Sequence, residues 1–95
     1  MDFPAFVDSL EAAAPAAELS PCLQALWWAR KGDWERAHTL AQEVETPQGS
    51  LVHAYLHRVE GDIGNARYWY ARAGRPAAAG PLEAEWEETV RELLD

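Results

Sequence analysis

Apolar residues recur every three or four positions along most of this chain, which is the spacing of one face of an α-helix. The pattern is clearest near the C-terminus, where polar and charged residues fill the positions between the apolar ones. The apolar positions of that segment are Leu82, Trp86, Val90, Leu93 and Leu94. The spacing predicts an amphipathic helix that buries one stripe against the rest of the protein.

Turn and capping residues divide the pattern into about six short helices. Ser20-Pro21 and Thr46-Pro47 each combine an N-cap residue with proline at the first helical position. Gly32-Asp33 and Gly61-Asp62 each combine a helix stop with the next N-cap. The predicted helices cover residues 3–10, 21–31, 34–45, 47–60, 63–73 and 81–94. A linker rich in Gly, Pro and Ala occupies residues 74–80.

The composition favours the same fold class. Apolar residues make up 48% of the chain, and 18 of them are alanine, a strong helix former. One Ile and five Val are too few for a typical sheet. We therefore expect a single all-α domain over residues 1–95.

A shift of 29 residues aligns part of the chain with itself. The shift superimposes Gly32 on Gly61, Asp33 on Asp62 and Ala37 on Ala66. Each unit then contains a helix, a tight Gly-Asp turn and a second helix. This repeat predicts two stacked antiparallel hairpins, at about residues 21–47 and 47–76, followed by a C-terminal capping helix at 81–94. Small residues such as Ala37 and Ala66 would allow the two helices of a hairpin to approach closely.

The turn segments resemble those of the tetratricopeptide repeat family. Residues 61–73 match its Gly-Asp turn, and Ala66, Tyr70 and Ala73 match its small, aromatic and small positions. Residues 32–37 match the same turn in the first unit. The family repeat is about 34 residues long, so the spacing here is irregular. The resemblance covers roughly residues 21–76 and implies an interaction scaffold whose first helices line a concave surface.

The leading functional hypothesis is a non-enzymatic protein- or peptide-binding module without a cofactor. The chain has more aromatic residues than one buried stripe needs, and arginines accompany them on the predicted first helices. The expected groove residues are Trp27, Arg30, Tyr55, Arg58 and Tyr68. The partner would be another protein or peptide, or a second copy of the chain in a self-associating homodimer.

An alternative hypothesis is a protein that binds a metal ion or a small molecule, and an enzyme would be one form of it. His53 and His57 are four residues apart, on one face of the fourth predicted helix, and Glu60 follows on that face. Two imidazoles at this spacing can chelate zinc or another divalent ion. His38 can add a ligand only if the tertiary structure brings it close. No catalytic motif accompanies these residues.

Charge and cysteine content exclude several other classes. The net charge is −8, and residues 81–95 carry six acids and one base, which disfavours nucleic acid and anionic membranes as partners. No apolar run is long enough to span a membrane. Cys22 is the single cysteine, so no intrachain disulfide can form, and we expect it to be a buried small apolar residue. These features favour a cytoplasmic protein.

Overall fold

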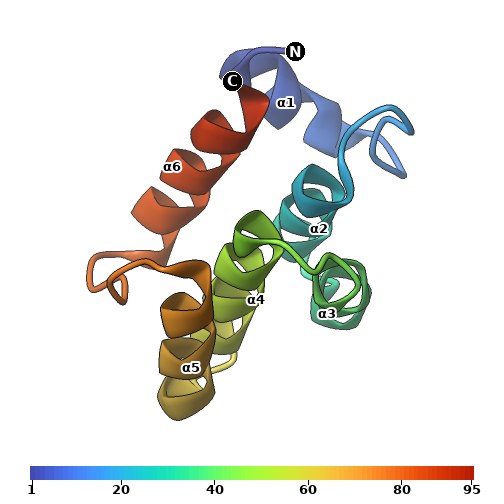
Figure 1. Cartoon of the computed structure of the whole chain (residues 1–95). Coiled ribbons are helices and arrows are strands. Elements are labelled where there is room, and N and C mark those ends of the chain that lie inside the picture. The colour runs from blue at the N-terminus through green and yellow to red at the C-terminus, as the bar shows by residue number, and fades with distance from the viewer.

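The computed structural model describes residues 1–95 and consists of six α-helices with no strand (Figure 1). The helices are α1 (Phe3–Asp8), α2 (Pro21–Arg30), α3 (Trp34–Gln42), α4 (Pro47–Val59), α5 (Ile63–Ala73) and α6 (Leu82–Leu94), with a 3₁₀ turn at Ser9–Glu11. The all-helical prediction is confirmed. The first helix is shorter than expected because its last turn is 3₁₀, and α3 ends at Gln42 rather than Glu45. None of the helices combines the length and apolar character needed to cross a bilayer.

Side-chain caps begin four of the helices where the sequence predicted them. Each cap accepts a hydrogen bond from the backbone N–H three residues later, and the four residues are Ser20, Asp33, Thr46 and Asp62. Gly32 and Gly61 adopt φ of +88° and +85°, a left-handed conformation that glycine adopts with little strain. The Gly-Asp turns therefore close two hairpins, α2–α3 and α4–α5.

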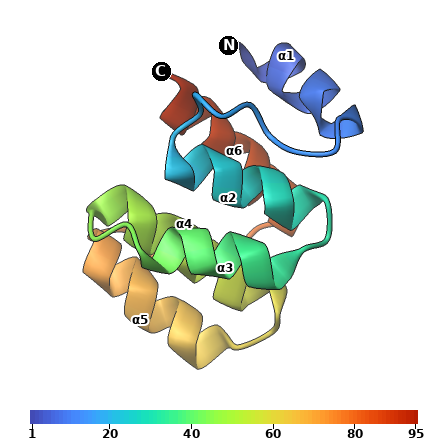
Figure 2. The same ribbon diagram turned by 90° about the vertical axis from the view of Figure 1, so that its right-hand side faces the viewer.

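The two hairpins stack on one another. The helices of each hairpin pack together, and α3 also packs on α4 and so joins the two units (Figure 2). Ala37 and Ala66 are both buried, and Ala66 packs with Leu51 and Ala54 of α4. These small residues allow the close approach that the repeat predicted.

The last helix, α6, lies against the first helices of both hairpins rather than only at the end of the stack. It packs on α2 and α4 and touches α1 (Figure 1). Trp86 anchors it, since its indole is buried and packs against Phe3 and Phe6 of α1, with ring centroids 5.9 Å away in each case. The indole N–H of Trp86 donates a hydrogen bond of 2.9 Å to the carbonyl oxygen of Leu26. Helix α6 is thus an integral part of the core.

We expect Gly49→Ala to lower the free energy of unfolding by about 1–3 kcal/mol. Gly49 lies in the first turn of α4 against Val44, and a β-carbon there would overlap the backbone carbonyl of Val44. Gly64→Ala is the matched control, because Gly64 is also helical but its missing β-carbon points into open space. The control should be neutral or more stable by up to about 1 kcal/mol. Urea unfolding measures both variants. Equal free energies of unfolding for Gly49→Ala and Gly64→Ala would contradict the close approach of Gly49 to Val44.

Candidate metal centre

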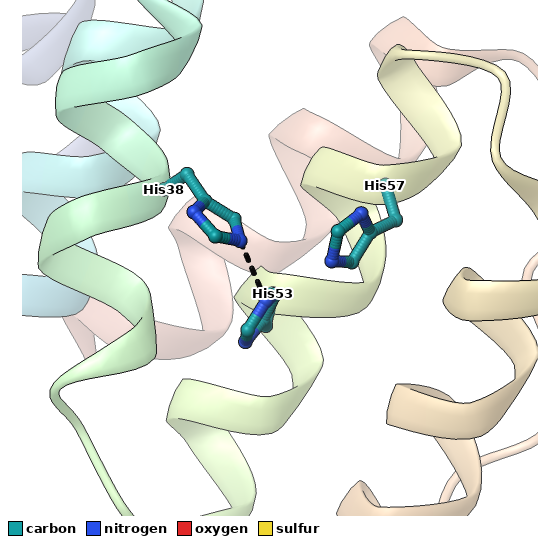
Figure 3. A group of neighbouring side chains, drawn as sticks. All are labelled: His38, His53 and His57. Carbon is teal, nitrogen blue, oxygen red and sulfur yellow. Dashed lines mark hydrogen bonds between the residues drawn. The ribbon is translucent and has the colours of Figure 1, made fainter.

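Three histidines from two adjacent helices converge on one point (Figure 3). His38 comes from α3, while His53 and His57 come from α4. The Nε2 atoms of His38 and His53 are 2.9 Å apart, and one ring nitrogen from each histidine lies within 4.8 Å of the other two. The structure therefore adds His38 to the pair that the sequence singled out, because the packing of α3 on α4 brings it close.

Two tryptophans hold these rings in place. Trp34 stacks on His38 with ring centroids 4.6 Å apart, and Trp69 of α5 stacks on His53 at 3.9 Å. The indole N–H of Trp34 in turn donates a 2.7 Å hydrogen bond to the carbonyl oxygen of Leu56. The imidazoles are thus oriented by their surroundings, which is what a preorganised ligand set requires.

Glu60 lies behind His57. Its Oε1 atom is 2.6 Å from Nδ1 of His57, so Nδ1–H can donate to the carboxylate. That tautomer leaves Nε2 of His57 with a free lone pair. Histidines that ligate metals commonly donate their other N–H to a carboxylate in this way. Glu60 was a candidate ligand in the sequence, and the structure places it where it can orient a ligand.

The environment keeps two of the rings neutral at pH 7. Burial, reinforced by the neighbouring His38 and His57, lowers the pKa of His53 to about 4. Burial also lowers the pKa of His38, with His57 adding to the effect and Glu60 opposing it. Metal ions bind the neutral imidazole, so both rings are in the protonation state that a metal requires.

The aromatic residues predicted for a peptide groove do not share an open surface. Trp27 is fully buried, and its indole N–H donates to the Ser9 hydroxyl at 3.1 Å. Tyr55 is 6% exposed, and burial raises the pKa of its hydroxyl to about 12. Tyr68 is 54% exposed but lies on α5, the second helix of its hairpin.

The two predicted groove arginines are paired with α6. Arg30 lies 3.0 Å from a carboxylate oxygen of Glu83, and Arg58 lies 2.7 Å from one of Glu85. These ion pairs connect α6 to the first helices of both hairpins. The face on which the groove was expected is therefore occupied by the C-terminal helix of the chain itself.

The resemblance to the tetratricopeptide family rests on the two Gly-Asp turns. In the structure both turns connect helices of a hairpin, at Gly32 and at Gly61. Helix pairing of this kind is common to many all-α proteins. No protein-family model, curated protein or solved structure matches this chain, so membership of that family stays a prediction.

Proposed function

We propose that this protein binds a divalent transition-metal ion, with Zn²⁺ as the first candidate, through His38, His53 and His57. The observation that carries the proposal is the convergence of three ring nitrogens within 4.8 Å of one another. Imidazole nitrogen is a preferred ligand of Zn, Cu, Ni and Fe ions. Three histidines with a fourth position left open form a known type of zinc centre.

Two of the three histidines are already near the spacing of a zinc site, and the ring nitrogen of His57, within 4.8 Å of theirs, would have to move closer. Zn–N bonds of about 2.0–2.1 Å place tetrahedral ligand atoms roughly 3.3 Å apart. The Nε2 atoms of His38 and His53 are 2.9 Å apart and share a hydrogen bond, so they would separate by a few tenths of an ångström. Metal binding would release the shared proton into solvent.

The ion pairs of α6 favour the metal proposal over the peptide groove. Arg30 and Arg58 already have carboxylate partners, and Tyr55 is buried. A peptide on that face would have to displace α6 and unpair these charges. The histidine cluster requires no such displacement.

Titration of tag-free, chelator-treated protein with Zn²⁺ tests the proposal. Calorimetry, or competition with a chromophoric chelator, should show one ion per chain. His38→Gln, His53→Gln and His57→Gln should each weaken binding by more than about 100-fold, and Glu60→Gln by about 10- to 100-fold. Glu35→Gln is the matched control, because Glu35 is exposed on α3 and has no ion pair.

Two further measurements keep the result interpretable. Circular dichroism confirms that each variant is folded before its affinity is compared. Co²⁺ in place of Zn²⁺ reports the ligand set through its visible absorption, which should change with each histidine variant and remain unchanged in Glu35→Gln. Wild-type binding no tighter than that of the triple histidine variant would refute the metal centre.

A further inference from the structure

A cavity of about 470 Å³ opens beside the histidine cluster. Its walls come from the end of α3, the loop before α4, the start of α4, and α5. The polar and aromatic residues among its walls include Glu45, Thr46, Ser50, His53, Trp69 and Arg72. Cavities of roughly 300–1,000 Å³ are typical of small-molecule sites.

His53 connects the cavity to the candidate metal centre. The ring belongs to the three-histidine cluster and also forms part of the cavity wall. Trp69, which stacks on this ring at 3.9 Å, continues the same wall. A molecule in the cavity would therefore lie next to a ligand of the metal ion and against an aromatic face.

Arg72 supplies a positive charge that no carboxylate of the chain neutralises. Five other arginines form ion pairs with Asp or Glu, namely Arg30, Arg36, Arg58, Arg75 and Arg91. Arg72 instead lies with its guanidinium carbon 5.5 Å from the Trp69 ring and donates a long hydrogen bond of 3.4 Å to the Tyr68 hydroxyl. Arg67 is also without an ion pair, but only Arg72 lies on the wall of the cavity beside the histidines. Its planar guanidinium can donate two parallel hydrogen bonds to a carboxylate.

We propose that this cavity binds a small monocarboxylate, which Arg72 holds and whose anionic end meets the open position of the ion on His38, His53 and His57. This inference rests on the proposed metal binding. Three protein ligands leave a fourth coordination position for an exogenous ligand. His53 covers one face of the Trp69 ring, and the half-buried ring also lines the cavity, where it offers apolar surface to the body of the molecule. Glu45 on the same wall disfavours more highly charged anions such as phosphate.

Benzoate is a suitable probe, because it combines one carboxylate with a ring that can stack on Trp69. Titration of Co²⁺-loaded protein with benzoate should change the visible absorption of the ion in a saturable way. Arg72→Met should weaken benzoate binding by about 10- to 100-fold while leaving the affinity for Co²⁺ unchanged. Arg67→Met is the matched control, since Arg67 is an exposed arginine of α5 without an ion pair and does not line this cavity.

The outcomes separate the two proposals. Failure of Co²⁺ to bind would overturn the metal centre and this inference together. Binding of Co²⁺ with no spectral response to benzoate would overturn the carboxylate site alone. Equal loss of benzoate binding in Arg67→Met and Arg72→Met would also overturn it, because the effect would then be one of overall charge. Inorganic phosphate should compete poorly, and tighter binding of phosphate than of benzoate would contradict the monocarboxylate assignment.

Discussion

Replacing Arg58 with methionine is expected to lower the free energy of unfolding by about 3–5 kcal/mol. The guanidinium of Arg58 lies 2.7 Å from Glu85, and the two side chains are only 14% and 8% exposed. Arg58 also donates to the carbonyl oxygen of Gly80, and Tyr70 donates its hydroxyl hydrogen to the other carboxylate oxygen of Glu85. Loss of Arg58 would leave the buried carboxylate of Glu85 without its counter-charge. The contacts of α6 with α4 and α5 would therefore be less stable.

Urea unfolding at pH 7 measures this effect. Arg91→Met is the matched control, because Arg91 pairs with Glu87 across one turn of α6 and both side chains are about half exposed. Such a surface pair contributes less than about 1 kcal/mol. The guanidinium of Arg91 also lies 4.3 Å from the Phe3 ring, and such a contact at an exposed site adds about 0.5–1 kcal/mol. The double variant Arg58→Met with Glu85→Gln should lose less stability than Arg58→Met alone, since no unpaired charge is then buried. Similar losses in Arg58→Met and Arg91→Met would show that the Glu85 network contributes no more than a surface ion pair.

The helices could be predicted from the sequence because their boundaries are local. A cap such as Thr46 is followed by proline, and a stop such as Gly61 needs a left-handed backbone, so both can be recognised without tertiary structure. The position of α6 could not be predicted in the same way. Its apolar stripe is the same whether the helix covers the end of the stack or lies along it. The contact that decides its position, Trp86 to the carbonyl of Leu26, joins residues 60 positions apart.

Only part of the candidate site could be predicted from the sequence. His53 and His57 could be paired because four residues on a helix return to the same face. His38 belongs to another helix, and it reaches the pair only because α3 packs on α4. Nothing in the sequence connected Trp34 or Trp69 with these histidines, whereas the structure stacks one on His38 and the other on His53.

For the predicted groove, the sequence could not show which residues other helices would cover. Trp27 was assigned to the groove because the chain has more aromatics than one buried stripe needs, and Tyr55 because the repeat places it on a first helix. The count did not include the burial that α1 and α6 provide. In the structure both residues join a core that also contains Phe6, Trp86 and Val90. Helical periodicity describes each helix separately, so it cannot show how many of its faces are covered.

Acidification from pH 6.5 to pH 4 is expected to lower the free energy of unfolding by about 3 kcal/mol through His53 alone. Burial, together with His38 and His57, lowers the pKa of the folded ring from 6.5 to about 4. The unfolded chain therefore takes up this proton at a higher pH than the folded protein. Stability through His53 is fully present above pH 6.5 and declines as the pH falls toward 4. His38 contributes in the same direction, because its pKa is lowered as well.

Urea unfolding of the metal-free protein across this range measures the dependence on pH. His53→Gln removes the titrating ring, so the variant should show a shallower decline between pH 6.5 and 4 than the wild type. Saturating Zn²⁺ should make the wild-type decline steeper, because protons then compete with the metal for the same nitrogens. In His53→Gln, which lacks a ligand, Zn²⁺ should have little effect on the slope. The metal-free wild type could instead lose stability no faster than His53→Gln as the pH falls. The pKa of His53 would then be the same in the folded and unfolded chain. The burial and close packing that orient this ring within the candidate metal centre would then be absent.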